Sequence, residues 1–463
     1  MPHAGLKFGI FMAPFHRLGD NPTLAIHRDL ELIEHLDRLG FDEAWVGEHH
    51  SAGWETIASP EIFIAAAIER TRHIHLGSGV TSLPYHHPLL VAQRFVQLDH
   101  MSRGRIMLGC GPGALASDAY MMGIPADQQR RRMEEALAAI VALLACDAPV
   151  TMKTDWFTLN DARLHLAPYS APRFPISVAT STTPSGALAA ARHGLGMLSL
   201  GAGLPGGPQK LAEQWRMAEA EAARRGKTMD RANWRLVVNL HVAEDDEQAI
   251  RQVRLGERAE TEGYFGEVLA RPPTRSEDPL GDGLRAGTTL VGSPDTVAKG
   301  IARLLTFTEG GAGGGHDGAG EAGGSKGGAG GAGGSKDGDY GVDGAGSGKG
   351  GAYGAGEAGD SNESAFGAGE VRGSKGGAYG AGGILFRAHD WANRRDTWDS
   401  YELFARWVMP RFQNSLAMPI ASRDWCVANR GGIFAPNIAA LHKAFTDAGH
   451  AVPETDRLKL RQG

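Results

Sequence analysis

The chain has 463 residues, enough to bury a substantial core, and its formal net charge of −6 with 22% charged residues provides no basic surface for nucleic acid or an anionic membrane. Its three cysteines, Cys110, Cys146 and Cys426, are too few and too scattered for a disulfide framework or a tetrahedral metal site. The sequence begins with no secretory signal and contains no apolar run long enough to span a membrane. We therefore expect a cytoplasmic protein with a small-molecule partner.

The first part of the chain alternates predicted strands with predicted helices. Strands are expected at 6–13, within 40–54, at 74–83 and at 105–108, because apolar residues dominate each stretch. Asn21-Pro22 and Ser59-Pro60 place a capping residue before proline, the signal of a helix N-terminus. Helices are therefore expected after each of the first three strands.

The second part continues the alternation. Further strands are expected at 175–179, 198–200, 234–242 and 384–388. Helices are expected at 130–146, 185–193, 208–225, 245–269, 294–307 and 397–411, with a loop at 271–287. Eight strands alternating with helices predict a (β/α)8 TIM barrel rather than a doubly wound open sheet.

Residues 310–383 interrupt this pattern. They hold about half of the chain's 66 glycines and contain no Leu, Ile, Met or Trp, so they cannot form a core. Loop-closure entropy grows slowly with length, and a barrel can tolerate such an insertion before its last strand. The predicted organisation is a first barrel part at 1–309, a low-complexity, disordered insertion at 310–383, the last strand and helix at 384–413, and a helical extension at 414–463.

Glu48, His49 and His50 follow the second strand directly. Carboxyl ends of parallel strands form the active face of a barrel, so these side chains are candidates for catalysis, although capping the strand is an equally simple role. A neutral imidazole with a pKa near working pH can hold or accept a proton. A metal site is not expected, because adjacent residues on a strand point to opposite faces.

Three stretches have the composition of a cofactor site. Gly77 and Gly79 in the third strand would let a flat ring lie against the main chain. The glycine loop that contains Gly111 and Gly113 could approach a phosphate, but it lacks the GxGxxG dinucleotide fingerprint. The cluster 181–183, before a predicted helix, could bind an anion or merely cap that helix.

Five motifs in this order carry a family resemblance: GFDEAWVGEHH, LGSGVTSLPYHHP, LDHMSRGR, VGSPDTVA and HDWANR. Together they resemble the bacterial luciferase-like flavin monooxygenases, over roughly residues 6–308 and 384–412. EHHSAGWE and GPGALASDAYMMGI look most like the branch that includes limonene monooxygenase.

The resemblance implies a barrel that binds reduced FMN, with FAD as an alternative, supplied by a separate flavin reductase that uses NADH or NADPH. The reduced flavin and O2 would epoxidise or hydroxylate a small hydrophobic substrate such as a monoterpene, and a homodimer is compatible with this family. His49 matches the family's catalytic histidine, with Glu48 beside it, while His50 is interpreted as structural.

The resemblance also assigns cofactor residues. Gly79 and Val80 match an unusual backbone kink on which the flavin ring stacks, and Ser181, Thr182 and Thr183 match the phosphate site. Pro112 stands where the luciferase branch has an arginine, which leaves the phosphate without a positive partner. His87 matches a histidine near the mouth of the site, although it could equally begin a helix. A deazaflavin-dependent dehydrogenase or a non-catalytic flavin-binding barrel is the alternative.

Overall fold

Eight parallel strands form a closed ring in the computed structural model, which describes residues 5–181, 183–269, 276–309 and 380–452. The ring consists of β1 (Lys7–Phe15), β2 (Glu43–Val46), β3 (His75–Ser78), β5 (Ile106–Gly111), β8 (Ile176–Thr180), β9 (Gly196–Ser199), β10 (Trp234–Val242) and β12 (Gly383–His389). Each strand pairs with the next in this order, and β12 pairs with both β10 and β1, which closes the ring. The predicted (β/α)8 barrel is confirmed, while nearly all of the predicted insertion lies outside the described residues.

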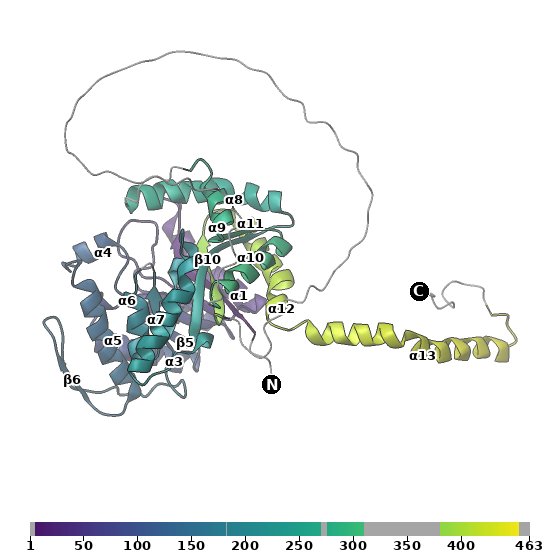
Figure 1. The fold of residues 1–463 in the computed structure, drawn as a ribbon, viewed down its shortest axis with the longest axis horizontal. Helices are drawn as coiled ribbons and strands as arrows, with labels where there is room; N and C mark the ends of the chain where they lie inside the picture. The colour runs from purple at the N-terminus through teal and green to yellow at the C-terminus, as the bar shows by residue number, and fades with distance from the viewer. Residues whose placement is uncertain (1–4, 182, 270–275, 310–379, 453–463) are drawn as a thin grey trace, which may run out of the picture. The chain divides into compact units, whose positions relative to one another are not determined.

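Helices cover the outside of the ring (Figure 1). They are α1 (Pro22–Leu39), α2 (Pro60–Arg70), α3 (Pro88–Ser102), α4 (Ala116–Met121), α5 (Gln129–Ala145), α6 (Ser185–His193), α7 (Leu211–Arg224), α8 (Asp246–Glu260), α9 (Pro279–Ala286), α10 (Pro294–Thr306), α11 (Arg394–Leu403) and α12 (Met409–Phe412). The predicted helix cap is confirmed for α1, where the Asn21 side chain accepts a hydrogen bond from Leu24 N. Ser59 precedes α2 but makes no such bond.

Side chains alternate between two layers along each strand. Phe8 and Ile10 of β1 and Phe386 of β12 face outward into the large core beneath the helices. Phe11 of β1 and Leu385 of β12 face the barrel interior, where they join a smaller apolar cluster with Trp45, Leu198 and Val237. This cluster packs in the middle of the barrel.

A buried ion pair closes the amino-terminal end of the barrel interior. Arg235 Nη2 lies 2.6 Å from Glu43 Oε1, and Arg235 Nε donates to Glu43 Oε2 at 2.8 Å. Burial raises the pKa of the Glu43 carboxyl, but the charge and hydrogen bonds of Arg235 outweigh it and lower that pKa to about 2. The pair is fork to fork, the strongest geometry for such an interaction.

Four local predictions require correction. The third strand is not continuous over 74–83, because β3 ends at Ser78 and a cis peptide bond joins Gly79 to Val80 before the short β4 (Thr81–Ser82). The predicted loop at 271–287 contains α9, which begins at Pro279 directly after Asp278. The helix predicted at 245–269 changes at Thr261 into a π-helix that ends at Val268. The helix predicted at 397–411 begins earlier, at α11, and passes through a π-helical turn, Phe404–Val408, into α12.

Three further strands were not predicted. β6 (Val150–Lys153) and β7 (Thr158–Ala162) form an antiparallel hairpin, and β11 (Thr289–Gly292) pairs with the carboxyl half of β10. Each has only four or five residues, which is too short for a clear apolar period.

The last described element is α13 (Ala417–Asp447), none of whose side chains is buried. Within the described residues, no helix combines the length and apolar character needed to cross a bilayer.

The Glu43–Arg235 pair makes a stability prediction. Replacing Glu43 by Gln leaves the Arg235 charge buried without its partner, which should lower the free energy of unfolding by about 3–5 kcal/mol. The double variant Glu43→Met/Arg235→Met removes both charges and should recover most of this loss. Urea unfolding measures both, and equal losses in the two variants would contradict this role of the pair.

The same pair predicts acid sensitivity. Because the pKa of Glu43 falls from 4.5 to about 2 on folding, its contribution to stability is complete above pH 4.5 and is lost as the pH falls toward 2. Unfolding curves across this range should show that loss in the wild type and a smaller one in the double variant.

Candidate active site

A cavity of about 1240 Å³ lies at the carboxyl ends of the strands. Phe15 at the end of β1, Glu48 and His49 after β2, Gly113 after β5 and Ser181 after β8 all border it. A pocket for one small ligand usually measures about 300–1,000 Å³. The volume therefore has room for a cofactor and a second molecule together.

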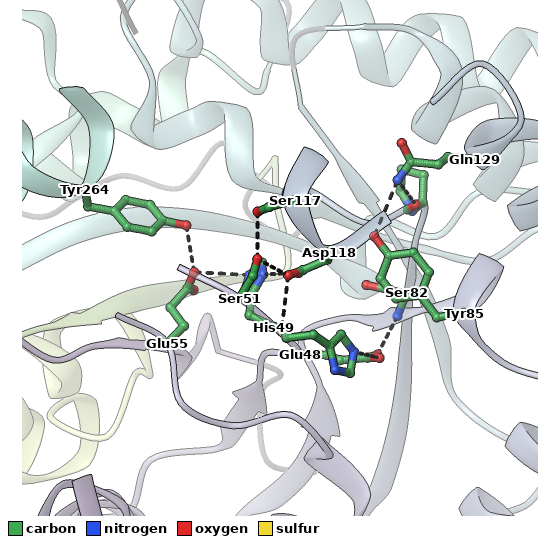
Figure 2. Close-up of polar contacts among 12 residues, drawn as sticks. Glu48, His49, Ser51, Glu55, Ser82, Tyr85, Ser117, Asp118, Gln129 and Tyr264 are labelled. Carbon is green, nitrogen blue, oxygen red and sulfur yellow. Dashed lines mark hydrogen bonds and ion pairs between the residues drawn. The ribbon is translucent and has the colours of Figure 1, made fainter. Parts of the chain in front are cut away.

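His49 is held between two carboxylates on the cavity wall. Its Nδ1 lies 3.2 Å from Asp118 Oδ2 and its Nε2 lies 3.3 Å from Glu55 Oε2, as Figure 2 shows. The main chain is fixed as well, because His49 N donates to the carbonyl of Ile57 at 3.1 Å. Both ring nitrogens thus have an acidic neighbour.

This arrangement favours the charged imidazolium. Burial lowers the pKa of His49, but the hydrogen bond to Asp118 and the charge of Glu55 outweigh it and raise the pKa above its ordinary value. Asp118 and Glu55, which cause this shift, lie 69 and 6 positions from His49, and the strand-end argument placed neither of them.

Asp118 and Glu55 come from different segments. Asp118 lies on α4, where its Oδ1 accepts hydrogen bonds from His50 N at 3.1 Å and from Ser51 Oγ. Glu55 is buried, and Tyr264 OH donates to its Oε2 at 2.7 Å. Burial raises the pKa of Glu55. Both acids stand in the motifs EHHSAGWE and GPGALASDAYMMGI, which gave the signal that could have identified them.

Both carboxylate oxygens of Glu48, which borders the cavity, have hydrogen-bond partners. Its Oε1 accepts from His50 Nε2 at 2.8 Å and from His86 Nε2 at 2.6 Å, and its Oε2 accepts from Ser82 N at 2.7 Å. Burial opposes ionisation, but these hydrogen bonds outweigh it and lower the pKa of Glu48. Glu48 therefore ties the segment after β2 to the segment after β3, which suits positioning, and its catalytic role stays a prediction.

The histidines after the third strand divide into two roles. His87 is the residue before the first turn of α3, and its ring packs against Phe157 at 6.0 Å. The structure therefore shows the helix-start role for His87. The sequence did not single out the neighbouring His86 as a partner of Glu48, because only the fold brings the two together.

The main chain of Gly79 and Val80 borders the cavity. A Cβ on Gly79 would lie 2.8 Å from Trp45 Cβ, so only glycine allows the main chain at position 79 to lie this close to Trp45. Gly77 is also packed against Trp45, since a Cβ there would lie 2.8 Å from the Trp45 ring, but Gly77 does not border the cavity. The predicted bare patch is thus limited to Gly79 and Val80, because Trp45 fills the space over Gly77.

A second end of the cavity has the composition of an anion site. Ser181, Thr183, Ser185 and Gly186 border it around the N-terminus of α6, whose first turn has no side-chain cap. The free N–H groups of a helix N-terminus favour a phosphate. Thr182 lies outside the described residues.

Only part of the glycine loop after β5 borders the cavity. Gly113 and Pro112 border the cavity, whereas Gly111 packs against the Val80 side chain. Gly111 therefore supports the Gly79–Val80 segment from behind, and only Gly113 is placed to approach a ligand.

Arg130 is a positively charged residue on the cavity border that the sequence analysis did not single out. It lies in the first turn of α5, is exposed and borders the same cavity as Ser181 and Thr183. Among the described residues it has no ion-pair partner, unlike its neighbour Arg131, which pairs with Asp155 at 2.7 Å. Sequence reasoning missed Arg130 because it follows Pro112 by 18 positions, across α4.

No group of three or more His, Cys, Asp or Glu side chains is arranged to hold a metal ion in the part of the chain that the structure describes. The carboxylates around His49 instead bind imidazole, hydroxyl and main-chain N–H groups.

Comparison with known proteins matches this geometry to one family. The sequence model described as luciferase-like monooxygenase matches residues 6–311. Limonene 1,2-monooxygenase from Rhodococcus erythropolis is 52% identical over 65% of this chain and 77% of its own length. 4-Hydroxyprotoasukamycin monooxygenase from Streptomyces nodosus subsp. asukaensis is 39% identical over 91% of this chain and 96% of its own.

A solved structure shares the fold. The oxygenating constituent of 3,6-diketocamphane monooxygenase from Pseudomonas putida, in complex with FMN, superposes with a TM-score of 0.62 at 21% identity. The alignment covers 88% of this chain and 98% of that structure.

The environment of His49 predicts a measurable titration. Asp118→Asn removes the acidic partner of Nδ1, so the pKa of His49 should fall in the variant. NMR of the imidazole resonances against pH measures this change. A pKa of His49 that is the same in both proteins would show that Asp118 does not hold the imidazolium.

The difference in the free energy of unfolding between the wild type and Asp118→Asn should depend on pH. Because folding raises the pKa of His49, the stabilisation from its charged form is complete below the unfolded value and is lost as the pH rises through the folded value. The difference between wild type and Asp118→Asn should therefore shrink toward alkaline pH.

Proposed function

The chain belongs to the family of luciferase-like monooxygenases, and we propose that it is the oxygenase of a two-component system. It would use reduced FMN and O2 to epoxidise or hydroxylate a small hydrophobic molecule such as a monoterpene. The observation that carries the proposal is one cavity bordered by His49, by the Gly79–Val80 main chain and by the anion site at Arg130. The 52% identity to limonene 1,2-monooxygenase supports the monoterpene class.

The cavity residues fit a flavin mononucleotide. The phosphate would bind at Arg130, Ser181, Thr183 and the N-terminus of α6, and the ring would lie on Gly79 and Val80. When bound, the reduced flavin supplies the electrons that activate O2. FAD remains the alternative cofactor.

His49 would hold a proton at Nε2, on the side of Glu55. Asp118 fixes the ring orientation through Nδ1, as a carboxylate does for many catalytic histidines. Phe11, Phe15, Tyr264 and Phe265 border the same space and would exclude water from the reacting groups. The protein residues thus provide a fixed proton and a dry surrounding.

A separate flavin reductase is the proposed partner. The glycine loop that contains Gly111 and Gly113 lacks the dinucleotide fingerprint, so reducing equivalents from NADH or NADPH would arrive on the flavin itself. The cavity would then receive a cofactor that is already reduced.

Turnover tests the proposal directly. The protein, a generic flavin reductase, NADH, FMN and air should convert limonene into a product with one added oxygen atom, detected by mass spectrometry. His49→Asn should lower kcat by about 10²–10⁴-fold, because it removes a positioned proton donor. His87→Asn, on a histidine that packs against Phe157 outside the cavity wall, should leave kcat unchanged. Turnover with a reduced deazaflavin and no O2 would instead indicate a dehydrogenase.

A variant of Arg130 tests whether this residue binds the flavin phosphate. Arg130→Ala should weaken binding of reduced FMN by roughly tenfold to a hundredfold, the loss expected for a charged hydrogen bond. Binding of reduced riboflavin, which has no phosphate, should not change. Arg131→Ala on the same helix is the matched control, since Arg131 pairs with Asp155. Equal losses for FMN and riboflavin would place Arg130 outside the phosphate site.

A further inference from the structure

A mostly buried arginine borders the cavity on the side of β12. Arg387 lies two positions after Leu385 on the inner face of that strand, and its side chain is only 15% exposed. Its Nε donates to Asn239 Oδ1 at 2.7 Å, and its Nη1 lies 2.6 Å from Glu260 Oε1. The contact of Nη1 with Glu260 is an ion pair without hydrogen-bond geometry, and within the described residues Nη2 donates no hydrogen bond. One edge of the guanidinium is therefore unused beside the cavity.

Three aromatic rings fix the guanidinium plane. Its central carbon lies 4.7 Å from the ring centroid of Phe15, and 5.7 Å from those of Phe265 and Trp391. Trp391 Nε1 also donates to Glu260 Oε2 at 2.9 Å, so both oxygens of the paired carboxylate have partners. A donor held in this way needs no reordering when it meets a ligand acceptor.

The charges around Arg387 favour a neutral acceptor over an anionic one. Glu260 already balances the arginine charge, and Glu55 and Glu257 border the same cavity. A ligand carboxylate would add a negative charge beside these acids. A carbonyl oxygen accepts a hydrogen bond without adding charge.

We propose that Arg387 binds a carbonyl oxygen of the substrate, so that the preferred substrate is a mainly apolar ketone, enone or quinone rather than a pure hydrocarbon. The apolar part of this molecule would contact Phe15 and Phe265, which border the cavity beside the guanidinium. The inference rests on the proposed function, since it names the substrate class of the same cavity.

A hydrocarbon would leave the unused edge of Arg387 buried without a partner. Such an unsatisfied donor weakens binding by on the order of tenfold or more. Sites that hydrogen-bond a ligand oxygen discriminate strongly against the analogue that lacks it. The hydrophobic effect alone would give the opposite order, because a hydrocarbon leaves water more readily than its ketone.

Limonene and carvone form a suitable probe pair, since carvone is the limonene skeleton with a ring carbonyl. Their dissociation constants are measured by calorimetry under argon, with and without saturating reduced FMN. The wild-type protein should bind carvone about tenfold or more tightly than limonene. Equal affinities, or tighter binding of limonene, would overturn the proposal.

Two variants test whether Arg387 causes the preference for carvone over limonene. Arg387→Met/Glu260→Gln removes the ion pair without leaving a buried charge unpaired, and it should bind limonene at least as tightly as carvone. Arg387→Lys retains a charge for Glu260 but loses the planar fork, and it should lose most of the carvone preference while keeping the fold. A carvone preference that survives in folded samples of both variants would contradict the assignment.

Binding of reduced FMN distinguishes the proposed carbonyl site from the proposed oxygenase function. Reduced FMN should bind the double variant and the wild type with the same affinity, and a tenfold loss would show that Arg387 contacts the flavin instead of the substrate. If the wild-type protein binds no reduced FMN but still prefers carvone, the proposed oxygenase function fails while the carbonyl site stands.

Discussion

The placement of His49 between Asp118 and Glu55 is the constraint on which the rest of the site depends. The two acids arrive from α4 and from the segment after β2, and each is fixed by further partners, Ser51 and Tyr264. A largely buried imidazole with an acidic side chain at each nitrogen is held in one orientation, and these neighbours raise its pKa. The His49 ring therefore has a defined position on the cavity wall.

The barrel provides this precision through its closed ring and its filled interior. Glu43 and Arg235 satisfy each other at one end, and the cluster around Trp45 fills the middle. Polar side chains that face inward near the other end, such as Arg387 and Asn239, must then pair with each other or with a ligand. Function is concentrated where the packed interior stops.

The sequence predicted what depends on local pattern and missed what depends on pairing across the ring. Strand β10 and helix α6 were predicted to the residue, because their periodicity and flanking turns are strong. His49 was singled out because it follows a buried strand and lies in the EHH motif, and its catalytic role stays a prediction. Its partner Asp118 lies 69 positions away, and no local period records such a contact. Gly77 was misread for the same reason, since only the fold places the Trp45 ring over it.

A crystal structure of the protein with bound FMN tests the central claim most directly. We expect the isoalloxazine ring against the main chain of Gly79 and Val80, the phosphate within hydrogen-bond distance of Arg130 and Ser181, and the His49 imidazole facing the ring from between its two carboxylates. A flavin bound elsewhere, or a His49 side chain turned out of the cavity when the flavin is present, would contradict it.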